Sequence, residues 1–135
     1  MTVRLGHDWA DGFTLIELLV VISLIIVLAS MGMVQYASSV TRAKEAVLKE
    51  DLFRIRDAID QYYADKNKYP ASLEALVSEK YLRQVPVDPI TNRAGSWQTV
   101  MAEPDPLNPT AEAGIYDIRS GAQGSALDGT NYSEW

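Results

Sequence analysis

The sequence has no cysteine and only one histidine, His7, among its 135 residues. The lack of cysteine excludes disulfides and thiol chemistry, so other contacts must hold the loops of any folded domain. No glycine-rich phosphate loop or nucleophile motif occurs either. Asp88, Asp105 and Asp117 are expected in turns and strands of a domain too small for an evident cleft. The sequence therefore predicts a protein that is not an enzyme.

Basic residues are also scarce, since 12 Lys and Arg stand against 18 Asp and Glu, which leaves a net charge of −6. No basic patch interrupted by aromatic residues offsets this balance, so a nucleic-acid partner is not expected. The length leaves room for one small domain beyond a membrane anchor.

Charge is entirely missing between Leu18 and Val34. Together with Leu15 and Ile16, this run supplies the roughly 20 apolar residues that an α-helix needs to cross a bilayer. Glu17 is the exception at its start. A carboxylate in hydrocarbon costs about 2.5–3.5 kcal/mol at the centre of a span and less near its end, so Glu17 is a functional-site hypothesis that requires a positive partner.

The motif Gly12-Phe13-Thr14-Leu15-Ile16-Glu17-Leu18 resembles the prepilin class, which comprises type IV pilins and the pseudopilins of type II secretion. The resemblance implies that a prepilin peptidase removes residues 1–12 as a leader by cutting between Gly12 and Phe13. It also implies that the new amine of Phe13 is methylated. The positively charged amine of a neighbouring subunit is then the partner of Glu17 during filament assembly, a pairing that sets register more than it stabilises.

The same resemblance implies where the chain resides and what it meets. Residues 13–35 are expected to form a single transmembrane and filament-core helix in the bacterial inner membrane, and residues 36–135 a periplasmic domain. The implied partners are further copies of the chain, prepilin peptidase, minor pseudopilins and an inner-membrane assembly platform. The leader departs from the class because it is not basic, which weakens the positive-inside signal.

The helix is predicted to continue to about residue 65, because neither proline nor glycine occurs between Gly32 and Pro70. Apolar residues at helical spacing draw one stripe along it: Leu48, Leu52, Ile55, Ile59 and Tyr62. The charged residues between them are expected to be a solvated face: Lys44, Glu45, Lys49, Glu50, Arg54, Arg56 and Asp57.

The segment 65–70 is predicted to end this helix, because Asn67 suits a turn and Pro70 restricts the residue before it. A short amphipathic helix capped by Ser72 and reaching Tyr81 is expected next. Strands are predicted at 97–101 and 114–118, separated by an extended loop at 103–109 without internal backbone hydrogen bonds. The fold class is therefore α+β and pilin-like: the long helix packs against the short helix, a small antiparallel sheet and an ordered C-terminal loop.

The tail, residues 120–135, is rich in glycine yet ends in aromatic residues that favour burial. With Tyr69-Pro70 and the segment 85–89, it resembles the major pseudopilin branch, whose C-terminal loop binds a structural calcium ion. That resemblance implies calcium ligands at Asp128, Gln123, Asn131 and the carbonyl of Ser120. Only one of these is a carboxylate. The alternative is a metal-free loop held by Tyr132 and Trp135.

Taken together, these features predict a structural subunit of a type II secretion pseudopilus, which helps to drive protein export across the outer membrane. Two alternatives stay open. One is a type IV pilin of a surface filament for adhesion or motility. The other is an unprocessed, single-span membrane-anchored binding module.

Overall fold

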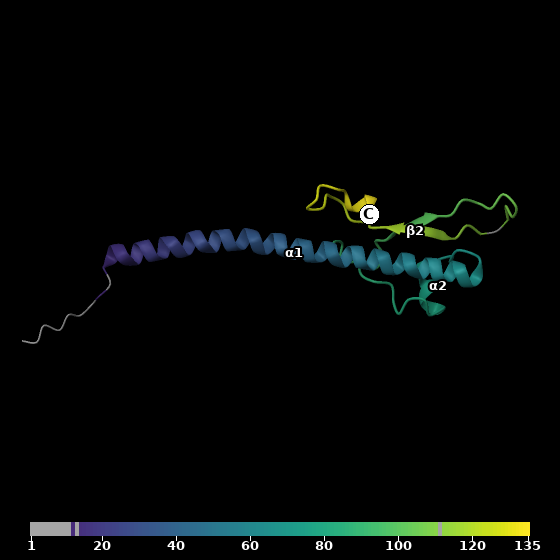
Figure 1. Ribbon diagram of the computed structural model, residues 1–135, viewed down its shortest axis with the longest axis horizontal. Helices are drawn as coiled ribbons and strands as arrows, with labels where there is room; N and C mark the ends of the chain where they lie inside the picture. Colours follow the sequence, from purple (N-terminus) through teal and green to yellow (C-terminus); the bar gives the residue numbers. More distant parts are fainter. Residues whose placement is uncertain (1–11, 13, 111) are drawn as a thin grey trace, which may run out of the picture. The chain divides into compact units, whose positions relative to one another are not determined.

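The computed structural model describes residues 12, 14–110 and 112–135. Five elements follow one another along the chain: α1 (Leu15–Lys66), α2 (Leu73–Ser78), β1 (Gln98–Met101), β2 (Ile115–Arg119) and the 3₁₀ helix η1 (Tyr132–Glu134) (Figure 1). Contacts divide the chain after Ser38 into an N-terminal segment and a second compact unit, Ser39–Trp135, called the head below. The predicted α+β class is confirmed.

Helix α1 runs without interruption through both units and ends where the sequence predicts. Asn67, directly after its last residue, has a φ of 54°, a left-handed conformation that asparagine tolerates better than most residues. Its amide still donates to the carbonyl of Tyr63, at 2.8 Å. The helix therefore stops at a left-handed asparagine, before Pro70 is reached.

The core of the head is the predicted apolar stripe of α1. Leu48, Leu52, Ile55 and Ile59 are at most 2% exposed, and Tyr62 is also buried. Ile115 and Ile118 of β2 and Leu73 and Leu76 of α2 belong to the same cluster of buried side chains. Figure 1 shows α2 and the two strands alongside the second half of α1. These elements are the cover that the stripe requires.

Helix α2 begins as predicted, because Ser72 Oγ accepts a hydrogen bond from the amide of Ala75 at 3.2 Å. It is shorter than predicted and ends at Ser78, so the placement of Tyr81 in this helix was wrong. Lys80 has a φ of 66°, and the amide of Tyr81 turns back to the carbonyl of Leu76 at 2.8 Å. This left-handed turn terminates α2 without glycine.

Strands β1 and β2 form an antiparallel pair in which Gln98 lies opposite Arg119 and Met101 opposite Ile115. An irregularity between Val100 and Met101 shifts the register by one residue. Both strands are confirmed with boundaries displaced by one residue. Trp97 precedes β1, where it is buried and donates from Nε1 to the carbonyl of Pro86 at 2.8 Å.

The loop between the strands corrects one prediction. Backbone hydrogen bonds were not expected within 103–109, yet the amide of Asn108 donates to the carbonyl of Asp105 at 3.0 Å. The side chain of Asp105 also accepts from the amide of Leu107 at 2.8 Å. An aspartate at the start of a turn commonly organises it in this way, and here it outweighs the extended preference of the neighbouring prolines.

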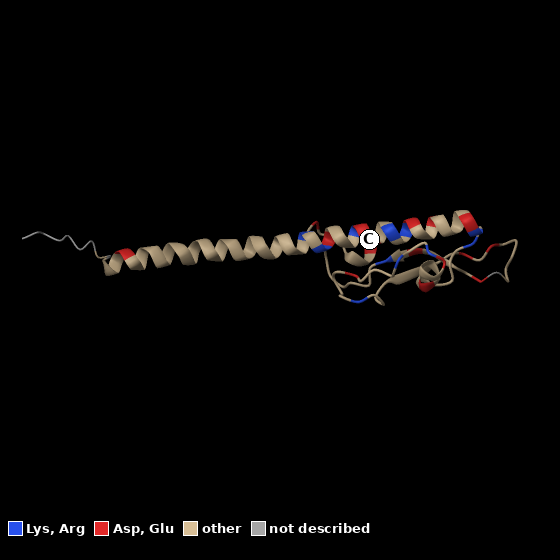
Figure 2. Ribbon diagram, turned by 90° about the horizontal axis from the view of Figure 1, so that it is seen from below, with Lys and Arg blue, Asp and Glu red and all other residues tan. Residues whose placement is uncertain are grey.

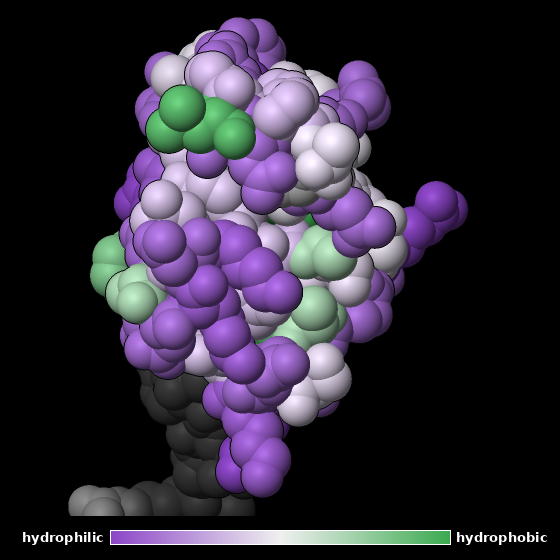
Figure 3. All heavy atoms as spheres, turned by 90° about the vertical axis from the view of Figure 1, so that its right-hand side faces the viewer, coloured by the Kyte–Doolittle hydropathy of each residue, from purple (hydrophilic) through white to green (hydrophobic). Residues whose placement is uncertain are grey.

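Charge is distributed unevenly along α1 (Figure 2). Its N-terminal part carries one acidic residue, Glu17, and the charged residues begin again at Arg42. The end of the head seen in Figure 3 is mainly hydrophilic, with small separate hydrophobic patches. This end of the head therefore has the surface of a domain that faces water.

Candidate functional site

The N-terminal segment of α1 presents its apolar side chains outward on all sides. Every large aliphatic side chain from Leu15 to Val34 is 44–79% exposed. The two hydroxyls between Leu15 and Val34 are satisfied inside the helix, since Ser23 and Ser30 each donate to the carbonyl four residues earlier at 2.7 Å. By length and composition this stretch of α1 can cross a membrane. A helix that satisfies its own polar groups suits hydrocarbon.

Glu17 lies in the first turn of α1 and is exposed. Its amide donates to Thr14 Oγ1 at 3.3 Å, so Thr14 caps the helix, a role that the sequence reading missed although Thr-x-x-Glu is a known capping pattern. The positive end of the helix dipole also favours a carboxylate here. Among the described residues, the Glu17 carboxylate has no hydrogen-bond or ion-pair partner.

The predicted processing site is only partly described. Gly12 is exposed and precedes α1. Phe13 lies outside the described residues, as does the leader up to residue 11. The cleavage between Gly12 and Phe13, the methylation of Phe13 and its pairing with Glu17 stay predictions.

The C-terminal tail folds back onto the head through its aromatic residues. Tyr132 is buried, and its ring meets that of Trp135 edge to face at 5.3 Å between centroids. Trp135 Nε1 donates to Thr130 Oγ1 at 2.7 Å, and Lys49 Nζ lies 4.2 Å from the Trp135 ring. The tail is therefore ordered and ends in packed aromatics, as the sequence predicts.

Two charged residues of α1 that were expected in solvent bind this tail instead. Glu45 is only 9% exposed, and its Oε1 accepts from the amide of Leu127 and from the hydroxyl of Tyr132, both at 2.9 Å. Burial and this hydrogen bond raise the pKa of Tyr132 above its usual range. The solvated-face prediction was wrong for Glu45, because the tail covers that side of α1.

Arg56 is the second of these residues. Its Nη2 donates to the carbonyls of Ile118, at 2.9 Å, and Trp135, at 2.6 Å. Its Nε donates to Asp117 Oδ1 at 2.7 Å, which makes an ion pair that is partly sheltered from water. Glu50 and Arg54 form an exposed i, i+4 ion pair at 2.9 Å on the same helix. Only some of the charges on α1 therefore form the expected solvated face.

Two of the four predicted calcium ligands, Asp128 and Asn131, have side-chain oxygens that accept hydrogen bonds within the tail. Asp128 Oδ1 accepts from both the amide and the hydroxyl of Thr130, which lowers the pKa of Asp128. The amide oxygen of Asn131 accepts from Ser125 Oγ at 3.2 Å, while Gln123 is exposed. Within the described residues no group of three or more His, Cys, Asp or Glu lies close enough to hold a metal ion. The donor set is poor for calcium, which prefers several carboxylates.

Ser120, the fourth of these residues, belongs to a buried network. Its hydroxyl donates to Asp88 Oδ2 at 2.6 Å, and both residues are fully buried. The other oxygen of Asp88 accepts from the amides of Ile90, at 2.8 Å, and Thr91, at 3.3 Å. Asp88 thus ties the 88–93 turn to the start of the tail, a structural role for one of the carboxylates weighed as a catalytic candidate.

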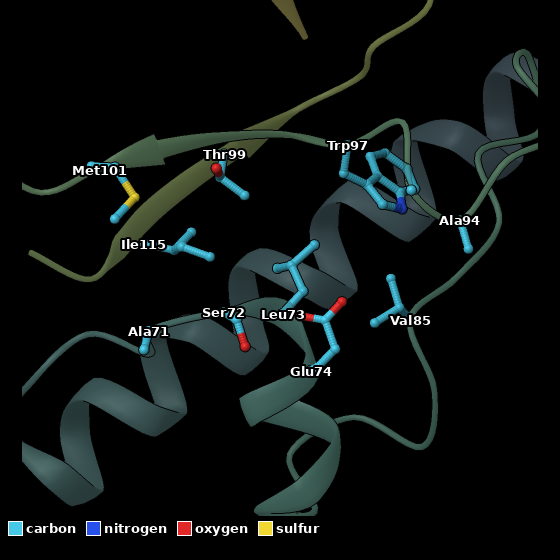
Figure 4. Close-up of a pocket in the computed structure, with 11 residues that line it drawn as sticks. Ala71, Ser72, Leu73, Glu74, Val85, Ala94, Trp97, Thr99, Met101 and Ile115 are labelled. Atoms are coloured by element: carbon cyan, nitrogen blue, oxygen red, sulfur yellow. The ribbon is translucent and has the colours of Figure 1, made fainter.

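A cavity of about 380 Å³ lies between the start of α2 and the sheet. Figure 4 shows Leu73 and Glu74 of α2 facing it from one side and Thr99, Met101 and Ile115 from the other. Glu74 is the only titratable residue in its lining. A single carboxylate does not supply the acid and base pair that carboxylate-based hydrolysis requires.

Comparisons with known proteins point to one family. The family model described as the prokaryotic N-terminal methylation motif matches residues 10–33. Type II secretion system core protein G of Pseudomonas aeruginosa is 37% identical over 98 residues, which cover 61% of this chain and 69% of that protein. Its counterpart in Escherichia coli is 30% identical over 145 aligned residues, covering 93% of this chain and 92% of that protein.

A fimbrial protein, EcpC of Eikenella corrodens, is 35% identical over 81 residues, but these cover only 56% of this chain and 53% of that protein. No solved structure is significantly similar to the chain. The Escherichia coli relative is matched over nearly the whole chain, so that likeness extends beyond the methylation motif into the head. The chain therefore belongs to the type II secretion system core protein G family of pilin-like major pseudopilins.

Proposed function

We propose that this protein is the structural subunit of a type II secretion pseudopilus, which is processed between Gly12 and Phe13 and polymerises through its N-terminal helix. The observation that carries the proposal is the outward-facing apolar segment of α1 with Glu17 in its first turn. Membership of the core protein G family supports the same reading. The work of the molecule is then assembly rather than catalysis.

Assembly replaces contacts between the apolar segment and lipid by contacts with the same segment of other copies. In lipid its exposed aliphatic side chains already lie in an apolar medium, so packing against other copies gains little from the hydrophobic effect. Association therefore depends on close packing and on specific polar pairing. The energy for extraction comes from the assembly platform that the family implies.

Glu17 is the group that can make this pairing specific. Hydrolysis of the Gly12–Phe13 bond frees an α-amino group whose ordinary pKa is about 7.7–8.0, so it carries a positive charge at neutral pH. In low dielectric an unpaired carboxylate is strongly disfavoured, and this amine on a neighbouring copy is the nearest cation that maturation creates. Their pairing sets the stagger between subunits.

The proposal also sets orientation and partners. The apolar segment spans the bacterial inner membrane, and the head faces the periplasm. The mainly hydrophilic end of the head in Figure 3 supports contact with water. Prepilin peptidase acts on the chain before assembly, and minor pseudopilins and the inner-membrane platform join it during assembly. The first step that can be tested is the removal of the leader at the N-terminus.

Mass spectrometry of the protein from its native membranes tests the maturation step. The expected product begins at methylated Phe13. A chain that retains residues 1–12 would overturn the proposal and leave the unprocessed single-span module, with Glu17 in need of another partner.

A second test separates assembly from membrane insertion. Glu17→Gln removes the charge, and Ser23→Ala removes a hydroxyl of the same helix that is already satisfied internally. Breaking a buried charge pair costs about 3–5 kcal/mol, so Glu17→Gln is expected to abolish sheared filaments, while Ser23→Ala keeps them. Both variants should reach the membrane in equal amounts by immunoblot. Filaments of normal yield from Glu17→Gln would exclude the proposed role of Glu17.

The surface pilin is the second candidate, because a fimbrial protein is among the relatives. Deleting the chromosomal copy distinguishes the two functions. Loss of secreted proteins from the medium with unchanged surface attachment is expected for a pseudopilin. Loss of attachment with normal secretion would favour the pilin.

A further inference from the structure

The tail of the head, residues 120–135, is closed onto α1 by side chains of opposite charge. Glu45 gathers donors from the tail, namely the amide of Leu127 and the hydroxyl of Tyr132. Arg56 gathers acceptors, namely the carbonyls of Ile118 and Trp135 and the carboxylate of Asp117. All of these contacts join α1 to residues that lie at least 61 positions later in the sequence.

A calcium ion closes a loop by collecting oxygen atoms around a positive charge. Glu45 is of the opposite charge, and its carboxylate accepts hydrogen bonds from an N–H and an O–H group of the tail. Around Arg56 the positive charge is present already, and its guanidinium occupies carbonyl oxygens of the kind that calcium takes. The loop contacts that a cation provides are thus supplied by the protein.

The remaining oxygens of the tail favour the same conclusion. The only carboxylate among the predicted calcium ligands, Asp128, accepts two hydrogen bonds from Thr130. A cation already lies close by, since Lys49 Nζ sits over the Trp135 ring. At the four predicted ligands a divalent ion would meet the single carboxylate of Asp128 and the nearby positive charge of Lys49, which is an unfavourable balance.

We infer that Glu45 and Arg56 hold the C-terminal loop of this protein in place of a calcium ion, with Glu45 as the positioning residue for Leu127 and Tyr132. The inference does not depend on polymerisation, so it stands or falls separately from the proposed function. The inference favours the metal-free alternative for the tail. It explains that alternative by the contacts that Glu45 and Arg56 of α1 make with the tail.

The test uses the full-length protein in detergent micelles, in excess calcium chloride and in excess chelator. The expected result for the native sequence is the same melting temperature under both conditions. Glu45→Gln keeps the shape of the side chain but loses its charge, and a fall in melting temperature of roughly 4–8 °C is expected under both conditions. The matched control is Glu50→Gln on the same helix, whose exposed pair with Arg54 should contribute almost nothing.

Hydrogen exchange by mass spectrometry provides a readout that a general loss of stability does not reproduce. In Glu45→Gln, peptides from 120–135 are expected to exchange faster at temperatures far below melting, while peptides that contain α2 are unchanged. If Glu45→Gln does not fold, Tyr132→Phe removes one donor and keeps the ring, with the same local effect at smaller size. Melting that rises with calcium in the native protein, or tail exchange unaffected by either variant, would overturn the inference.

Discussion

The two parts of α1 use apolar residues in opposite ways. Within the N-terminal segment the large aliphatic side chains face outward on every side, whereas in the head one stripe of the same helix is buried almost completely. Both parts have the same backbone and no proline. The difference lies in where the partner surface comes from: the head carries its own cover in α2, β2 and the tail. Among the described residues, the aliphatic side chains of the N-terminal segment are exposed and so are available to lipid or to other copies.

Exposed aliphatic side chains have different consequences in the two parts of α1. An exposed aliphatic residue in the head is a minor cost, while exposure along a whole helix marks a surface that is intended for lipid or for other copies. The same distinction applies to carboxylates. Glu45 finds donors within the head, but Glu17 has none among the described residues.

The largest expected difference between the two parts of α1 is the loss of stability when an isoleucine of each part is replaced by alanine. Ile55→Ala removes a fully buried side chain and is expected to lower the free energy of unfolding of the head by about 2–5 kcal/mol. Ile25→Ala removes a side chain that is 59% exposed and should leave that free energy unchanged. Denaturant unfolding of the full chain in micelles, followed by tryptophan fluorescence, measures both. Equal losses would show that the two parts of α1 do not differ as described.

Matched glycines are expected to give the next largest effect. A Cβ at Gly121 would lie 1.9 Å from the carbonyl oxygen of Ser96, which belongs to the backbone and cannot rotate away. Gly121→Ala should therefore cost about 1–3 kcal/mol in the same unfolding measurement. At Gly32 a Cβ meets nothing within 4 Å, and alanine favours a helix by up to about 1 kcal/mol. A destabilising Gly32→Ala would contradict the open surroundings of the N-terminal segment.

How far the sequence predicted this structure depends on the range of the interaction. The stripe of α1, the end of the helix near Asn67 and the cap at Ser72 follow from spacing within one or two helical turns, and they are confirmed. The two strands were found within one residue because alternation is equally local. The early end of α2 was missed because a left-handed lysine, Lys80, is not signalled by residue type.

The candidate sites divide in the same way. The methylation motif is contiguous and was recognised from seven residues, and the family model confirms it. The roles of Glu45 and Arg56 were missed, because charge spacing along a helix reports only the helix itself. Their partners lie in residues 117–135. The sequence offers one signal for the role of Glu45. A tyrosine that is expected to be buried, Tyr132, requires a polar partner for its hydroxyl.

The smallest expected effect concerns the two carboxylates near the ends of α1, Glu17 and Asp65, of which only Asp65 has a hydrogen-bond partner among the described residues. Asp65 accepts a hydrogen bond from the Tyr81 hydroxyl at 2.6 Å, and this bond, with burial, raises the pKa of Tyr81 from 10.0 to about 12. The folded state therefore holds this proton more tightly than the unfolded state. The contribution is present below pH 10 and is lost as the pH rises through 12.

Tyr81→Phe should accordingly flatten the decline in unfolding free energy over this alkaline range. Denaturant midpoints of the native and variant proteins at several pH values between 8 and 12 measure it. Parallel pH profiles would mean that Asp65 does not act on Tyr81. No comparable alkaline effect is expected from Glu17→Gln, because the Glu17 carboxylate has no such partner among the described residues.

The contacts between α1 and the tail also determine when the head can be completed during synthesis. Glu45 is separated from Leu127 by 82 residues and from Tyr132 by 87, and Arg56 from Trp135 by 79. Ribosomes add roughly 5–20 residues per second, so the carboxylate of Glu45 waits on the order of 4–16 s for its first donor. During that interval the helix is already made, and its apolar stripe lacks part of its cover. A chain interrupted before Leu127 would therefore leave Glu45 without either of the two donors that join it to residues 120–135.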